Sequence, residues 1–145
     1  MTTTMETYSP LYNALVKGDW ESSKAFLDQH PEALTAEISG VGERARFTAV
    51  VHGHVELVEE LVKMMPPDTL ELKTRGETAL HIAAAGAIVK IVKTLVERNE
   101  NLVRIPDADG QLPVSMAAFT GGMEVLDYLY SKTSPEDLRR VGISG

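Results

Sequence analysis

The chain has 145 residues, 43% hydrophobic and 24% charged, a length and balance that suit one soluble domain with a buried core. It contains no cysteine, which excludes disulfides, thiol catalysis and cysteine-bound zinc, and which favours a reducing compartment. A formal charge of −7 without a basic stripe argues against nucleic-acid binding. No apolar run approaches the roughly 18 residues of a membrane span, and the amino terminus lacks the features of a signal peptide. We therefore expect a cytoplasmic protein whose own chain does not insert into a membrane.

The first helix pair is expected in residues 8–38, after a flexible polar tail at residues 1–7. Ser9 and Pro10 have the residue types of an N-cap and a first helical position. A glycine–aspartate pair then separates this helix from a second one. The inward face of the second helix is expected to hold Trp20, Ala25, Phe26 and Leu27. For Trp20, a buried core aromatic is a better interpretation than a ligand platform.

The second pair is expected in residues 39–72, and its second helix, at residues 55–65, has the most regular apolar spacing in the chain. In its first helix, Arg46 stands at the position that holds leucine or valine in the first helices of the other three pairs. Burying a leucine there contributes roughly 1.5–3 kcal/mol, which an unpartnered arginine cannot match. Arg46 must therefore snorkel outward, pair with a carboxylate, or mark a weak helix. We expect this helix to be the least ordered, with Phe47 filling part of the missing volume.

The third pair, at residues 73–106, contains the sequence Gly-Glu-Thr-Ala-Leu-His-Ile-Ala-Ala from Gly76 onwards. Thr78 is expected to cap the first helix, and His81, one turn later, to hydrogen-bond back toward the turn. In the other pairs a glycine follows the first helix. Here that glycine is displaced to Gly86, and Ala87 stands at the position it occupies in the other pairs.

The fourth pair, at residues 107–133, begins with an acidic turn in which Gly110 needs a positive φ. Tyr128 and Tyr130 would face a missing next repeat unless something covers them. Residues 134–145 start with Ser-Pro-Glu-Asp-Leu, which reads as a short capping helix that stops at Gly142, or as the stub of a longer protein.

These segments are copies of one unit. The position of Thr78 recurs at Ser9, Arg44 and Leu112, at separations of 35, 34 and 34 residues, against about 33 for ankyrin repeats. The run from Thr78 to Ala83 is close to the ankyrin signature T-P-L-H-x-A, and residues 53–58 are close to G-H-x-E-x-V. The chain thus resembles an ankyrin-repeat protein. The resemblance implies an all-α solenoid of about four helix-turn-helix repeats with β-turn fingers.

The connectors after the second helices resemble those of plant ankyrin proteins that carry a carboxy-terminal membrane domain of the PGG type. This resemblance implies a non-catalytic module that binds a partner protein through its concave face. Its setting would be plant stress or defence signalling, at the cytosolic face of the plasma membrane if the chain is part of a larger protein. The family's contact positions fall here on Val16, Lys17, Val41, Glu43, Val51, His52, Thr74, Arg75, Glu77, Ala85, Ala108, Asp109, Gln111, Phe119 and Thr120.

Phe119 is the leading anchor among these positions and Arg75 the second, because aromatic and arginine side chains dominate binding energy at interfaces. For each, a merely exposed side chain remains the alternative.

Two functions remain as alternatives to a protein-binding module. His52 and His54 flank a glycine and could belong to a small metal-dependent enzyme, but a structural zinc site needs about four ligands, and His54 occupies the family's G-H position. The acidic turn at Asp107 lacks the acid at loop position twelve that calcium requires, where Ala118 stands. No phosphate-binding loop or nucleophile elbow is present, so we expect no enzyme, metal or cofactor.

The second alternative function is that of a structural spacer within a larger ankyrin protein.

Overall fold

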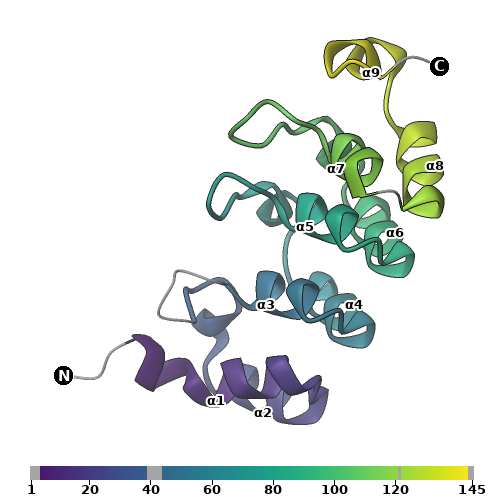
Figure 1. Ribbon diagram of the computed structural model, residues 1–145. Helices are drawn as coiled ribbons and strands as arrows, with labels where there is room; N and C mark the ends of the chain where they lie inside the picture. The colour runs from purple at the N-terminus through teal and green to yellow at the C-terminus, as the bar shows by residue number, and fades with distance from the viewer. Residues whose placement is uncertain (1–3, 39–43, 121, 144–145) are drawn as a thin grey trace. The chain divides into compact units, whose positions relative to one another are not determined.

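A computed structural model describes residues 4–38, 44–120 and 122–143, which form antiparallel helix pairs joined by short 3₁₀ segments (Figure 1). The chain divides into two compact units, Met1–Met65 and Pro66–Gly145. Within the described ranges, no helix is both long and apolar enough to cross a bilayer. The only strand-like pairing in these ranges is at two isolated bridges, one in each unit.

The first unit contains two helix pairs. Helix α1 packs against α2 and against α3, and α3 packs against α4. Their bounds are α1 Thr4–Lys17, α2 Trp20–Gln29, η1 Pro31–Leu34, α3 Ala45–Val51 and α4 Val55–Lys63.

The second unit contains two further pairs and a terminal helix. Helix α5 packs on α6 and α7, and α8 packs on α6 and α7, so that consecutive pairs stack side by side. Their bounds are η2 Pro67–Glu71, α5 Ala79–Ala85, α6 Val89–Arg98, η3 Glu100–Arg104, α7 Pro113–Thr120, α8 Met123–Lys132 and α9 Pro135–Arg140.

The amino-terminal helix differs from the prediction. It begins at Thr4 rather than after an N-cap at Ser9, and Pro10 lies inside it. Part of the segment expected as a tail is therefore helical, while residues 1–3 lie outside the described ranges. The local Ser-Pro signal was misleading because a proline costs one backbone hydrogen bond but does not by itself end a helix that packs on two neighbours.

The inward face of α2 also differs. Leu27 is buried as expected, but Trp20 and Phe26 are only half-buried and Ala25 is exposed. The Phe26 ring stacks on His30, with 4.6 Å between the centroids, and meets Tyr8 edge-on. Trp20 is therefore not the core aromatic that was predicted.

The shared core position of the four first helices is confirmed. Leu11, Leu80 and Val114 are buried in α1, α5 and α7, and Arg46 is buried with them, at 2% exposure. The snorkelling interpretation of Arg46 is wrong, because its guanidinium lies over the ring of the equally buried Phe47, 4.9 Å from the centroid. Burial, followed by repulsion from Arg44, lowers the pKa of Arg46 to about 10.

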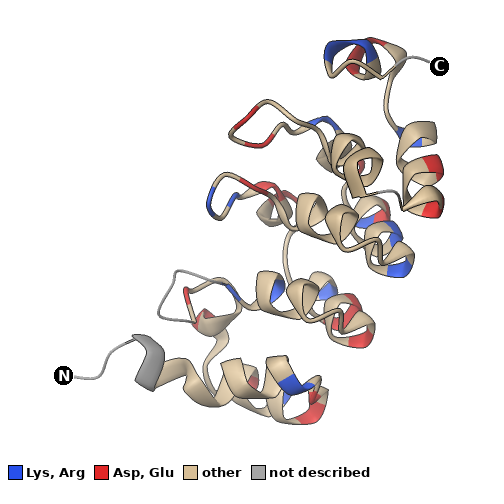
Figure 2. Cartoon of the chain, viewed as in Figure 1, with Lys and Arg blue, Asp and Glu red and all other residues tan. Residues whose placement is uncertain are grey.

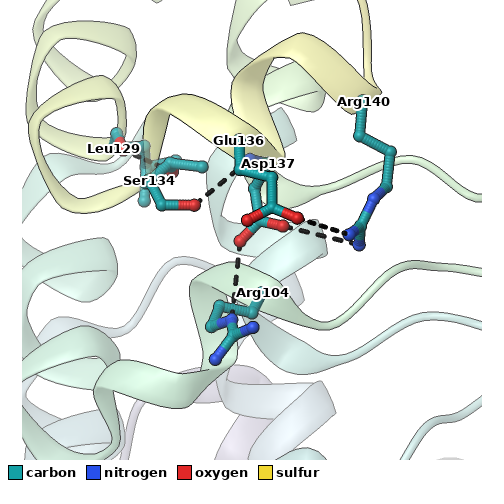
Figure 3. A network of polar contacts seen from close by, with 7 residues as sticks. Arg104, Leu129, Ser134, Glu136, Asp137 and Arg140 are labelled. Atoms are coloured by element: carbon teal, nitrogen blue, oxygen red, sulfur yellow. Dashed lines mark hydrogen bonds and ion pairs between the residues drawn. The ribbon is translucent and has the colours of Figure 1, made fainter.

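The carboxy-terminal segment forms the expected short helix. The Ser134 hydroxyl accepts a hydrogen bond from the backbone N–H of Asp137 at 3.1 Å, and Gly142, two residues after the end of α9, is left-handed at φ 81°. The Asp137 side chain is only 4% exposed and forms ion pairs with Arg104 and Arg140, each at 3.4 Å (Figure 3). The ion pair with Arg104 joins α9 to η3, whereas the ion pair with Arg140 lies within α9.

Tyr128 is covered by two lysine side chains. The ammonium groups of Lys93 and Lys132 lie over its ring, at 5.5 and 5.8 Å from the centroid. Burial is the main cause that raises its pKa, and Glu97 adds to the effect.

Candidate protein-binding surface

In the second unit, the turn before α5 is a closed finger. The backbone N–H of Thr74 donates to the Glu77 carbonyl at 2.8 Å, and the N–H of Glu77 donates back to the Thr74 carbonyl at 3.1 Å. Arg75 and Gly76 form the tip, with φ values of 53° and 82°. This turn therefore holds the exposed Arg75 side chain at the tip of a finger closed by two backbone bonds.

The turn before α7 is built around Asp107. Its Oδ1 atom accepts hydrogen bonds from the backbone N–H groups of Asp109 and Gln111, both at 2.9 Å. Ala108 donates its N–H to the Gly76 carbonyl at 3.0 Å, which joins the two fingers of this unit. A side chain on Gly76 would meet the Ala108 methyl group at 2.7 Å, so the close approach requires glycine there. The acidic residues of this finger are coloured red on the ribbon in Figure 2.

His81 connects the first of these fingers to the second. Thr78 donates its backbone N–H to His81 Nδ1 at 3.3 Å, and the His81 backbone N–H donates to the Thr78 hydroxyl at 3.4 Å, as the sequence predicted. The other ring nitrogen, Nε2, lies 2.9 Å from the Gln111 carbonyl, to which it donates in this tautomer. Burial lowers the pKa of His81, although the bond to Gln111 opposes the shift.

The ends of α5 and α7 complete the surface of this unit. Phe119 is 74% exposed, the most exposed large hydrophobic residue in the described ranges. The neighbouring Thr120 hydroxyl donates to the Met116 carbonyl at 3.1 Å, and Ala85 is exposed at the end of α5. Just beyond, Ala87 adopts φ 56°, the left-handed conformation that glycine has at this position in the other unit.

In the first unit, the predicted residues lie at the ends of two packed helices. Lys17 is exposed at the end of α1, and Val51 and His52 are exposed at the end of α3. Val16 is half-buried, and its carbonyl lies 2.8 Å from His54 Nε2. The remaining two predicted positions, Val41 and Glu43, lie outside the described residues.

The histidine pair does not have the geometry of a metal centre. The rings of His52 and His54 are stacked with centroids 6.4 Å apart, and His54 directs Nε2 to a backbone carbonyl. Nowhere in the described part of the chain do three histidine or acidic side chains converge on one point. The residues therefore do not fit a site that needs about four ligands.

Three large exposed apolar residues, Met64, Leu72 and Met123, do not belong to the predicted set. Met123 is 65% exposed at the start of α8, and Leu72 is 56% exposed after η2. Repeat register does not predict the exposure of Met123, because the corresponding valines in the second and third pairs, Val55 and Val89, are half-buried. Met123 follows Phe119 by four positions in the chain, at the start of the next helix.

Helix pairs that stack on one another and carry protruding fingers are typical of helical repeat proteins. Such proteins bind through an extended surface rather than in a pocket. A family model described as "Ankyrin repeats (3 copies)" matches residues 47–139. The chain belongs to the ankyrin-repeat family, whose repeats support protein–protein interaction.

The chain is similar to two curated proteins. It is 35% identical over 71 residues to "Ankyrin repeat-containing protein ITN1" of Arabidopsis thaliana, a match covering 48% of this chain and 12% of that protein. It is 30% identical over 78 residues to "Probable 26S proteasome regulatory subunit p28" of Saccharomyces cerevisiae, covering 53% of this chain and 34% of that protein. These matches therefore span only a minor part of either relative.

The fold is similar to that of a chain in the crystal structure of the yeast ribosomal protein Rps3 in complex with its chaperone Yar1. The TM-score is 0.77 at 24% identity, covering 91% of this chain and 96% of that one. This likeness supports the ankyrin solenoid as the fold.

Proposed function

We propose that this protein is a non-catalytic module that binds a partner protein through its fingers and the ends of its first helices. The supporting observation is the exposed ring of Phe119 at the end of α7, in a unit whose two fingers are joined by a backbone hydrogen bond from Ala108 to Gly76. An exposed aromatic on a preformed surface loses little conformational entropy when it is buried by a partner. The contact set is the fifteen residues, from Val16 to Thr120, given above.

The proposed surface is tested by capture of partners from a cell extract. The double variant Phe119→Ala with Arg75→Ala is expected to weaken capture of a specific partner at least about tenfold, because it removes the aromatic and the arginine anchor. Helical content, measured by circular dichroism, should stay unchanged, since both side chains are exposed. Captured proteins are compared by quantitative mass spectrometry.

Met64→Ala provides the matched control, because Met64 is an exposed apolar residue outside the proposed set. It should leave capture unchanged. Equal capture by the wild type and the double variant would refute the assignment of the surface.

The finer assignment is also proposed. We place the protein in the cytoplasm, in plant stress or defence signalling close to the plasma membrane, and we place the repeat domain at residues 8–133. The similarity to the Arabidopsis protein supports the plant setting. Fractionation of plant cells that express a tagged chain tests the location, and recovery only from an organelle lumen would contradict it.

A further inference from the structure

The two fingers of the second unit carry opposite charges at matching positions. The finger before α5 contains Lys73 and Arg75, and the residues 34 positions later, in the finger before α7, are Asp107 and Asp109. Lys73, Arg75 and Asp109 are exposed. Glu77, the one acid of the first finger, is half-buried at its base. We call these turns the basic finger and the acidic finger; in Figure 2 their tips are blue and red on the ribbon.

The two fingers are adjacent, yet their exposed charges do not neutralise each other. The Ala108 N–H donates to the Gly76 carbonyl at 3.0 Å, which brings the tips together. In the described part of the chain, neither Lys73 nor Asp109 forms an ion pair. Asp107 differs, because its Oδ1 atom already accepts two backbone hydrogen bonds at 2.9 Å. Lys73 and Asp109 are therefore a cation and an anion that face solvent on neighbouring fingers.

An apolar anchor lies in the same repeat as the acidic finger. Helix α7 begins at Pro113, directly after that finger, and rises about 1.5 Å per residue, so Phe119 lies roughly 9 Å further along. The corresponding residue of α5, which packs on α7, is the much smaller Ala85. The ring of Phe119, 74% exposed, consequently has a small residue at the matching position of the neighbouring repeat.

The ring and the two charges contribute differently to binding. Burial of an aromatic side chain supplies affinity. Charges at the rim of an interface mainly determine specificity and the rate of association, because like charges brought together repel. A cation and an anion on neighbouring fingers therefore favour a partner that presents its own charges in one arrangement and disfavour the reverse arrangement.

We propose that this surface binds a protein segment whose acidic residue pairs with Lys73, whose basic residue pairs with Asp109, and whose apolar residue packs on Phe119. This inference rests on the proposed function, and it adds Lys73 to the contact set as a specificity-determining residue. Packed helices have axes about 8–10 Å apart, and an extended chain spans about 3.3 Å per residue. The acid and the base of the partner segment therefore stand about three residues apart.

Selection from a phage-displayed library of random peptides on the immobilised full chain tests the proposal. The most enriched peptide is synthesised with a fluorescent label, and its Kd is measured by fluorescence anisotropy. We expect it to contain an apolar residue together with an acid and a base about three residues apart.

Lys73→Glu is expected to raise the Kd of this peptide about three- to tenfold, because repulsion replaces attraction. Asp109→Lys should have an effect of the same size through the base of the peptide. A second peptide, with its acid changed to lysine, should bind the wild type more weakly and regain affinity for the Lys73→Glu variant.

The matched control is Lys90→Glu. Lys90 is an exposed lysine of α6, outside the fingers, and the residue 34 positions later, Glu124, is again an acid. The control makes the same change of charge in the same unit, and it should leave the Kd unchanged. An equal effect of Lys90→Glu and Lys73→Glu would overturn the proposal, because only the net charge would then matter.

The failure of this inference can be distinguished from failure of the proposed function. A selected peptide that needs Phe119 but binds the Lys73→Glu and Asp109→Lys variants as well as the wild type would overturn the charge assignment alone. If no selected peptide loses affinity in Phe119→Ala, both the inference and the proposed surface are wrong.

Discussion

Helices α3 and α5 occupy the same place in successive repeats and have seven residues each, yet their sequences support them very differently. Helix α5 begins with a capping box formed by Thr78 and His81. Helix α3 begins at Ala45, after the N-cap Arg44, which makes no side-chain capping bond, and it buries Arg46 where α5 buries Leu80.

The difference shows that packing, more than local signals, determines where these helices form. A seven-residue helix is too short to be stable alone in water, so both depend on their neighbours. In α3, Phe47 occupies the position of His81 and lies against the guanidinium of Arg46. The aromatic ring thereby fills volume and covers the charge at once.

The largest effect is expected from truncating the core of α5. Leu80→Ala should lower the free energy of unfolding by about 2–5 kcal/mol, because Leu80 is fully buried and its loss leaves a cavity. Urea denaturation followed by circular dichroism measures the change. Leu72→Ala, at an exposed leucine, should change the stability by less than about 0.5 kcal/mol. Equal effects would show that the repeat register is misplaced.

The matching change in α3 should act in the opposite direction. Arg46→Leu is expected to raise the free energy of unfolding by about 1–3 kcal/mol, because it replaces a buried charge by the residue that other repeats have there. Arg46→Ala should instead destabilise, since it leaves a cavity without adding apolar contacts. If Arg46→Leu destabilises the chain, the guanidinium is required for the packing of α3.

The caps provide a finer comparison. Thr78→Ala should cost about 1 kcal/mol, because the backbone N–H of His81 loses its acceptor. Arg44→Ala should cost less than about 0.5 kcal/mol, because Arg44 makes no side-chain capping bond to α3. Similar losses for both variants, in the same urea titrations, would remove the distinction between the two helix starts.

The smallest effect concerns pH. Burial holds the pKa of His81 below its ordinary 6.5, so between these two values the unfolded chain binds the proton and the folded chain does not. Stability from this group is therefore present above pH 6.5 and is lost as the pH falls below it. His81→Gln should show a smaller loss of urea midpoint between about pH 7.5 and 5.5 than the wild type. The same loss in both would mean that other groups cause it.

Much of the fold was predictable because its signals are periodic. The recurring glycines and apolar positions predict the helix pairs. Local hydrogen-bonding rules predict the caps formed by Thr78 with His81 and by Ser134 with Asp137. The burial of Arg46 was not predictable, since the chemistry of the residue alone argues against it. The bond from His81 to Gln111 spans 30 residues and depends on how the next repeat docks.

The candidate surface was predictable to a lesser extent. Repeat register identified Phe119 as an exposed aromatic, and the structure places it at the end of α7 with its ring largely in solvent. Register could not reveal that Met123 is exposed, because the same position is half-buried in other repeats. Whether Phe119 contacts a partner stays a prediction.

The turn at Ala87 constrains how this sequence can diverge. A methyl group added to Gly122 would come within 2.9 Å of the Ala87 methyl, while Ala87 itself already carries a left-handed backbone that glycine would accept more easily. A side chain at position 122 is therefore expected to be accommodated better when position 87 is glycine. Introduced beside Ala87, it would force one of the two turns to shift.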